Sequence, residues 1–146
     1  MITATWRGDS LLSETGAPLA VYDPGTGTLS ADDVSIEVKH SAGAMSWKVT
    51  GEVRDTGEKF SVRTRGIGVG TLTARCGSRT YTLERGGAFS KTRTLIDVSG
   101  APCATTSPKI GLDLAVTQTR DMPFADLVFL TWALTLIDTP ARRTLY

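Results

Sequence analysis

The stretch FADLVFLTWALTLID, residues 124–138, decides how the rest of the chain must fold. Its polar residues are Asp126, Thr131, Thr135 and Asp138, and the last three share one narrow stripe of a helix. Both threonine hydroxyls can donate hydrogen bonds to carbonyl groups of their own helix, so even this stripe tolerates burial. A helix that is apolar almost all round belongs in the interior of a protein.

The segment also has recognisable ends. Asp121 can cap the helix, and Pro123 suits its first turn. Thr139 precedes a proline, which drives it out of the helical conformation, so we expect the helix at about residues 123–138. The longest apolar run, residues 125–137, would reach roughly 20 Å as a helix, against about 30 Å of bilayer hydrocarbon. We therefore predict no transmembrane segment.

The remainder of the chain alternates between apolar and polar residues. In residues 34–38 and 45–53, every second side chain is apolar or glycine. Successive side chains of a strand point to opposite faces, so each run should bury one face and expose the other. We expect about nine short strands, near residues 10–13, 18–22, 34–40, 45–54, 58–65, 69–75, 79–85, 92–98 and 110–118.

Turn-forming residues separate these runs. Asp-Thr-Gly at residues 55–57 predicts a hairpin loop with the glycine in the left-handed conformation. Cys-Gly-Ser at residues 76–78 divides two further runs, and Asp-Pro-Gly at residues 23–25 is a third turn signal. The chain shows no linker and no fixed-period repeat, so we interpret residues 1–146 as a single domain.

A small β protein can shield an apolar helix in few ways. A single sheet covers one side of it, whereas a sheet curled into a barrel covers most sides and leaves no exposed edge. The predicted fold class is therefore mostly β (α+β): an antiparallel β barrel wrapped around a hydrophobic C-terminal helix. The alternatives are an open sheet or a sandwich, with the helix packed across one face or into a dimer interface.

This order of elements resembles the tubby C-terminal-like superfamily, which includes tubby domains, phospholipid scramblases and LURP-one-related proteins. The resemblance is carried by the run of short strands from Val34 to Val116 and by the terminal helix at residues 124–138, with its apolar centre at residues 127–137. It implies a barrel of about 9–12 strands that encloses the helix. It also implies a binding role, with phosphoinositide recognition by basic residues in tubby itself. The resemblance assigns that role to no particular residue of this chain.

Positive charge is concentrated in the middle of the chain. Residues 63–93 contain seven basic side chains and one acidic side chain, Glu84, which gives this segment a net charge of +6 in a chain of net charge +1. Alternation places Arg63, Arg65 and Arg75 on the solvent side, and Arg79 and Arg85 at strand ends near the rim. The guanidinium group of arginine can donate two parallel hydrogen bonds to phosphate or carboxylate oxygens. The candidate residues for an anionic ligand are Arg63, Arg65, Arg75, Arg79, Arg85, Lys91 and Arg93. The plainer interpretation is a solvated basic face that balances the acidic first third of the chain.

Several enzymatic and nucleotide-binding patterns are absent or incomplete. The glycines of residues 66–70 have the spacing G-x-G-x-G and precede a strand, so we interpret them as a strand connection. Residues 86–92 end in Lys-Thr as a P-loop does, but serine replaces the glycine before the lysine. His40 is the one histidine, and no G-x-S-x-G motif accompanies it, so we predict no catalytic residues.

Metal and disulfide chemistry are not indicated either. Cys76 and Cys103 are too few for a disulfide framework, and we expect two free thiols in a reducing compartment. One histidine and two separated cysteines do not suit a zinc site. The acidic pair Asp32-Asp33 lacks the spacing of a calcium loop and is expected to cap or solvate a turn. We predict no metal and no cofactor.

The leading functional prediction is a non-enzymatic binding domain for an anionic ligand or a lipid headgroup, cytoplasmic or peripheral to a membrane. The first alternative is a structural or interaction protein whose C-terminal segment mediates self-association as a homodimer or docks a protein partner. The second is a hydrolase that uses His40 as its base. We expect no nucleic-acid partner, because aromatic residues do not interleave with the arginines as stacking platforms would require.

Overall fold

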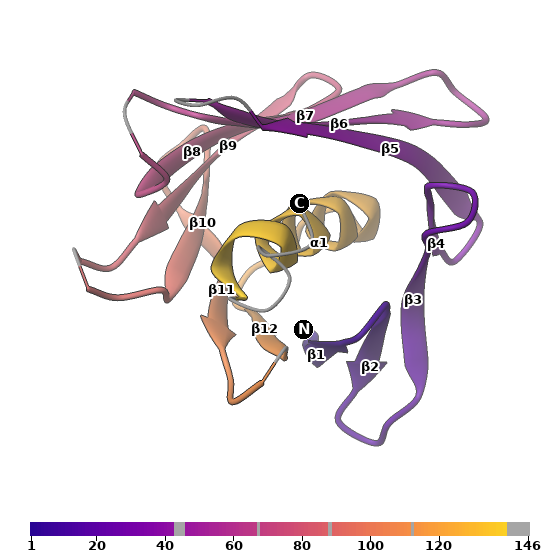
Figure 1. The fold of residues 1–146 in the computed structure, drawn as a ribbon, viewed down its shortest axis with the longest axis horizontal. Coiled ribbons are helices and arrows are strands. Elements are labelled where there is room, and N and C mark those ends of the chain that lie inside the picture. Colours follow the sequence, from indigo (N-terminus) through magenta and orange to yellow (C-terminus); the bar gives the residue numbers. More distant parts are fainter. Residues whose placement is uncertain (43–45, 67, 88, 112, 140–146) are drawn as a thin grey trace.

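The computed structural model describes residues 1–42, 46–66, 68–87, 89–111 and 113–139. Within these residues, twelve antiparallel strands form a closed barrel around a single helix (Figure 1). The elements are β1 (Thr3–Arg7), β2 (Ser10–Ser13), β3 (Pro18–Asp23), β4 (Thr28–Ala31), β5 (Val34–Ala42), β6 (Trp47–Val53), β7 (Lys59–Thr64), β8 (Thr71–Cys76), β9 (Arg79–Arg85), β10 (Arg93–Asp97), β11 (Pro102–Pro108), β12 (Leu114–Gln118) and α1 (Phe124–Asp138).

Every strand pairs with its neighbour in sequence, and β1 closes the ring against β12. The expected turns form: Gly57 has a φ of +71° in the β6–β7 hairpin, and Gly77 has a φ of +63° in the β8–β9 hairpin. Asp32 also has a positive φ, +51°, in the two-residue connection between β4 and β5. The pair Asp32-Asp33 is therefore a hairpin turn. Because the ring is closed, each described strand pairs with a neighbour on both sides.

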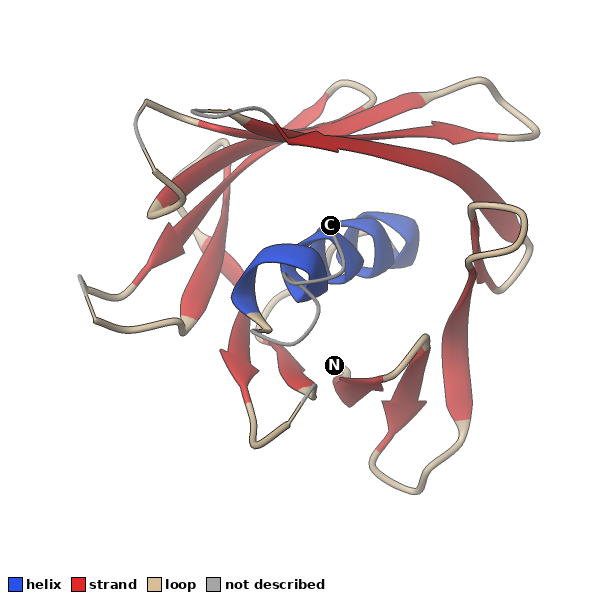
Figure 2. Ribbon diagram, viewed as in Figure 1, coloured by secondary structure: helices blue, strands red, loops and turns tan. Residues whose placement is uncertain are grey.

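Helix α1 lies inside the ring of strands (Figure 2). All residues from Asp126 to Asp138 are buried, and they pack against the inward side chains of the barrel. This confirms the predicted wrapped arrangement. The open sheet, the sandwich and the helix in a dimer interface are wrong for the described residues. The two threonine hydroxyls make the expected hydrogen bonds within their own helix. That of Thr131 donates to the carbonyl of Leu127 at 2.7 Å, and that of Thr135 donates to the carbonyl of Trp132 at 2.6 Å.

The helix ends differ in part from the prediction. Pro123 is the N-cap residue, and no side chain caps the helix, so the expected cap by Asp121 is wrong; its side chain is exposed. The first helical turn is closed by the backbone, where the amide of Leu127 donates to the carbonyl of Pro123 at 3.2 Å. Thr139 is extended, with φ −99° and ψ 113°, as expected for a residue before proline.

The barrel has twelve strands among the described residues, within the expected range of about 9–12, and the nine segments placed along the sequence omit three of them. The three are β1 and β4, which are only five and four residues long, and β11, which begins and ends in proline and carries little apolar alternation. The last predicted strand begins too early: Ile110 is fully exposed, and a turn with Gly111 at φ +84° precedes β12.

Candidate functional site

An acidic residue in the first turn of α1 is held by two side chains. Arg79 donates to both carboxylate oxygens of Asp126, from Nε at 2.7 Å and from Nη2 at 2.9 Å. The hydroxyl of Tyr81 donates to the same carboxylate at 2.5 Å. Arg79 also reaches Glu58 at 3.1 Å. Asp126 is completely buried, so these bonds compensate a charge that would otherwise be costly.

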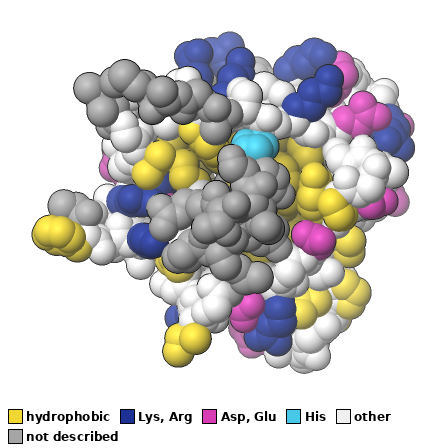
Figure 3. Space-filling model, viewed as in Figure 1, with side chains coloured by type: hydrophobic (Ala, Val, Ile, Leu, Met, Phe, Trp, Pro, Cys, Tyr) yellow, Lys and Arg dark blue, Asp and Glu magenta, His cyan; other side chains and the backbone are white. Residues whose placement is uncertain are grey.

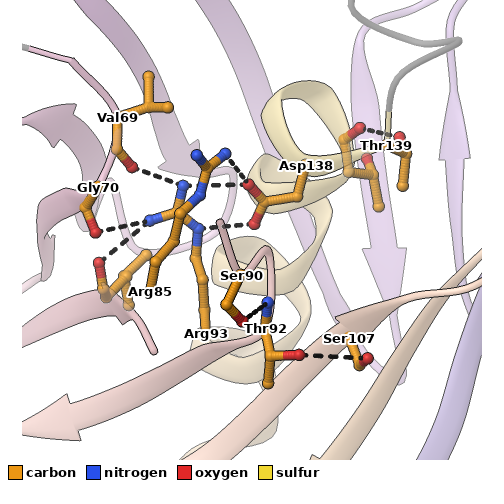
Figure 4. A network of polar contacts seen from close by, with 11 residues as sticks. Val69, Gly70, Arg85, Ser90, Thr92, Arg93, Ser107, Asp138 and Thr139 are labelled. Carbon is orange, nitrogen blue, oxygen red and sulfur yellow. Dashed lines mark hydrogen bonds and ion pairs between the residues drawn. The ribbon is translucent and has the colours of Figure 1, made fainter. Parts of the chain in front are cut away.

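The last helical residue is held in the same way at the other end of the barrel (Figure 4). Arg93, itself fully buried, donates to Asp138 from Nε at 2.6 Å and from Nη2 at 3.0 Å. Arg85 adds a third bond to Asp138 at 2.9 Å. The Arg93 guanidinium also donates to backbone carbonyls of Val69 at 2.6 Å and Leu83 at 3.3 Å. The glycine-rich connection at residues 66–70 is therefore a strand connection, as predicted, and it supplies carbonyl partners to a buried arginine.

These contacts divide the seven candidate residues into two groups. Arg79, Arg85 and Arg93 turn toward the helix and neutralise its two carboxylates. Placing Arg93 in one surface patch with the others is therefore wrong, since its side chain lies in the interior. Arg63 and Arg75 are exposed on the outer wall, as alternation predicted, and Arg65 is exposed in the β7–β8 connection. Lys91 is half-buried in the β9–β10 connection.

The outer arginines belong to a stripe of positive charge that crosses four strands. Lys48 on β6 lies directly opposite Arg63 on β7. Lys39 on β5 is diagonal to Lys48, and Arg75 on β8 is diagonal to Arg63. We call Lys39, Lys48, Arg63 and Arg75 the basic stripe. All four are exposed, and within the described part of the chain none forms an ion pair.

Lys39 and Lys48 lie outside the segment that the sequence predicts as basic. Charge was counted along the chain, and both lysines precede the basic segment at residues 63–93. The signal was nevertheless present, because a hairpin turn at residues 55–57 fixes which residues of β6 and β7 face each other. That register alone brings Lys48 opposite Arg63.

A groove of about 480 Å³ lies on the outer wall over β7 to β10. Register alternates its two arginines with hydroxyl groups: Arg63 is opposite Thr73, and Arg75 is opposite Thr80. The groove therefore combines two unpaired guanidinium groups with a row of hydroxyl donors. Its lining consists of Ser61, Arg63, Thr73, Ala74, Arg75, Thr80, Tyr81, Thr82, Asp97 and Val98.

One carboxylate borders this groove. The Ser99 hydroxyl donates to Asp97 at 2.6 Å, and the backbone amides of Ser99 and Ala101 add bonds of 2.9 and 3.1 Å. These hydrogen bonds lower the pKa of the Asp97 carboxyl below its ordinary value, so Asp97 stays ionised. The groove thus offers cationic donors on β7 and β8, and a fixed acceptor at the end of β10.

The remaining reactive residues do not join the groove. His40 is half-buried on β5, opposite Val49. Cys76 and Cys103 are free and buried, and burial raises the pKa of both thiols. Raised thiol pKa values disfavour the nucleophilic thiolate. Among the described residues, no cluster of three or more histidine, cysteine or acidic side chains has the arrangement of a metal site.

The C-terminal segment is largely covered by its own barrel. Every side chain from Asp126 to Thr139 is buried, so the described part of the segment leaves no apolar face for a second copy. The predicted self-association would therefore have to involve residues 140–146, which lie outside the described residues. No described helix is both long and apolar enough to span a bilayer.

Comparison with protein-family models, curated proteins and solved structures gives no significant match for this chain. Its architecture, a closed antiparallel barrel with one C-terminal helix, agrees with the fold of a tubby-like barrel. The candidate site therefore rests on the geometry of this chain.

The buried groups near Asp126 predict how stability depends on pH. Burial and then the hydrogen bond to Asp126 raise the pKa of Tyr81 above its ordinary value of 10.0, and burial raises that of Cys76 above 9.0. Folding therefore favours the protonated forms, and their contribution is complete below the pKa values of the unfolded chain. We expect the free energy of unfolding to fall as pH rises above about 9.

Urea unfolding at a series of alkaline pH values measures this effect. The fall should be shallower in Tyr81→Phe above about pH 10 and in Cys76→Ala above about pH 9, because each variant lacks one of the ionising groups. A wild-type stability that stays constant through this range would contradict the assignment.

Proposed function

We propose that the barrel is a non-enzymatic binding domain, and that the groove on its outer wall binds a ligand carrying phosphate or carboxylate. The observation that carries this proposal is the position of Arg63 and Arg75, which line one groove and make no ion pair within the described residues. Lys48 directly opposite Arg63 adds to the case. Like charges in cross-strand pairs are destabilising, and a bound anion would relieve the repulsion.

The chemistry of the lining favours phosphate in particular. Two guanidinium groups can fork onto phosphate oxygens, and the hydroxyls of Thr73, Thr80 and Thr82 can donate to the same group. The volume of about 480 Å³ lies within the range of small-ligand pockets, about 300–1,000 Å³. A lipid headgroup and a free phosphorylated molecule share this chemistry.

Membership of the tubby C-terminal-like superfamily is part of the proposal, supported by the barrel and its enclosed helix. A cytoplasmic site of action, free or at the membrane surface, is likewise proposed, and two buried unpaired thiols agree with a reducing compartment.

Isothermal titration calorimetry with inorganic pyrophosphate and with glycerol phosphate tests whether the groove binds phosphate. We expect binding that weakens as salt is raised, because exposed charges are screened. The double variant Arg63→Ala, Arg75→Ala should lose at least about tenfold in affinity. Arg54→Ala is the matched control, since Arg54 is an exposed arginine paired with Glu37 outside the groove.

The two sources of phosphate are separated by competition. If the ligand is a lipid headgroup, glycerol phosphate should displace the protein from vesicles that contain anionic lipid. If the ligand is a free molecule, the soluble probes should bind in the groove, and adding them should not change how much protein binds to vesicles. The groove is not the binding site if the double variant and the wild type bind the probes with equal affinity. The same conclusion follows if the wild type binds neither probe.

A further inference from the structure

Three connections lie at one end of the barrel, on the half of the ring formed by β7 to β12. Because neighbouring strands are antiparallel, the β7–β8, β9–β10 and β11–β12 connections all lie at the end where α1 finishes. The groove extends toward the opposite end, since Asp97 and Val98 at its border belong to the end of β10 and the β10–β11 connection. The two surfaces are therefore distinct.

Two of these connections carry fully exposed apolar side chains. Phe89 in the β9–β10 connection is 102% exposed, and Ile110 in the β11–β12 connection is 101% exposed. Hydrophobic surface stands out over both connections in Figure 3. A single exposed apolar residue needs no explanation, but two complete exposures on nearby connections at the same end do.

Cations accompany the apolar residues. Arg65 belongs to the β7–β8 connection, Lys91 follows Phe89 by two residues, and Lys109 directly precedes Ile110. Asp113 is the one carboxylate in the sequence of the three connections, and Arg7 binds it at 3.1 Å. We call Arg65, Phe89, Lys91, Lys109 and Ile110 the loop rim.

We propose that the loop rim rests on an anionic membrane surface, with Phe89 and Ile110 inserted into the interfacial layer. The apolar side chains stand on separate connections and do not form one continuous patch. A fluid bilayer accepts separate side chains independently, whereas a folded partner would need a matching pocket for each. The adjacent cations complement anionic headgroups.

Co-sedimentation with vesicles tests this proposal. The full chain is mixed with vesicles of phosphatidylcholine alone, or of phosphatidylcholine with phosphatidylserine. We expect preferential binding to the second, and a loss of at least about tenfold in partitioning for the double variant Phe89→Ser, Ile110→Ser. Val21→Ser is the matched control, because Val21 on β3 is 42% exposed and lies outside both the loop rim and the groove. All three replaced side chains are exposed, so the variants should unfold at the wild-type temperature.

The groove variant Arg63→Ala, Arg75→Ala distinguishes this proposal from the proposed function. It should keep its vesicle binding if the loop rim makes the membrane contact, even where its affinity for pyrophosphate is lost. The proposal is overturned if the wild type does not bind vesicles that contain phosphatidylserine, or if the double variant Phe89→Ser, Ile110→Ser (the rim variant) binds them as well as the wild type does. It is also overturned if sedimentation velocity shows a dimer that the rim variant loses, since the loop rim would then be a self-association surface.

Discussion

Replacing Arg93 by methionine is expected to destabilise the protein by about 3–5 kcal/mol, because it leaves a fully buried carboxylate without its main partner. Asp138 would keep only the bond from Arg85, and the carbonyls of Val69 and Leu83 would each lose one hydrogen bond. Urea unfolding followed by tryptophan fluorescence measures the change. Arg54→Met is the control, because both side chains of the Arg54–Glu37 pair are exposed and the pair should contribute little.

A double-mutant cycle shows whether the cost arises from the pair. Arg93→Met combined with Asp138→Leu removes both charges, so its effect should be smaller than the sum of the two single effects by about 1 kcal/mol or more. A loss below about 1 kcal/mol for Arg93→Met alone would mean that water or another side chain compensates Asp138, and that the helix end is not held as described.

Replacing Phe129 by alanine is expected to cost about 3–5 kcal/mol through lost burial and the cavity left behind. Its ring is fully buried and lies edge-on to Phe60, with ring centroids 5.4 Å apart. It also lies against the β6 backbone: a Cβ added to Gly51 would be 2.8 Å from the Phe129 ring. The bare backbone at Gly51 is what lets the ring come this close.

Thermal and urea unfolding measure this second effect. Phe89→Ala provides the matched control, because it removes the same side chain from a fully exposed position and should leave the free energy of unfolding unchanged. An effect of Phe129→Ala below about 1 kcal/mol would mean that α1 is peripheral to the core.

The enclosed helix could be predicted because its signal is local and strong. Residues 124–138 leave no polar face, and a small chain of alternating strands has few ways to cover such a segment. The hairpins at residues 55–57 and 76–78 could likewise be predicted, because each contains a glycine flanked by turn-forming residues. The pairing of β1 with β12 could not be predicted from the sequence, because it joins residues more than a hundred positions apart and has no local signal.

The candidate site could be predicted only in part. Outward alternation correctly placed Arg63 and Arg75 on the solvent side. Arg93 shares the inward parity of Leu95, which is a signal that it lies inside the barrel, but its partner Asp138 is 45 residues away. Local sequence predicts that the helix ends at about residue 138, but which strand residues then surround Asp138 depends on how the helix packs in the barrel.

The inner wall of this barrel is occupied by its own helix, so recognition is left to the outer wall. Amide NMR during a titration with pyrophosphate tests that claim most directly. The account predicts shifts that follow the groove, at Ser61, Arg63, Thr73, Arg75, Thr80 and Thr82, and none in residues 126–138. Shifts concentrated in the helix, or none at any groove amide, would contradict it.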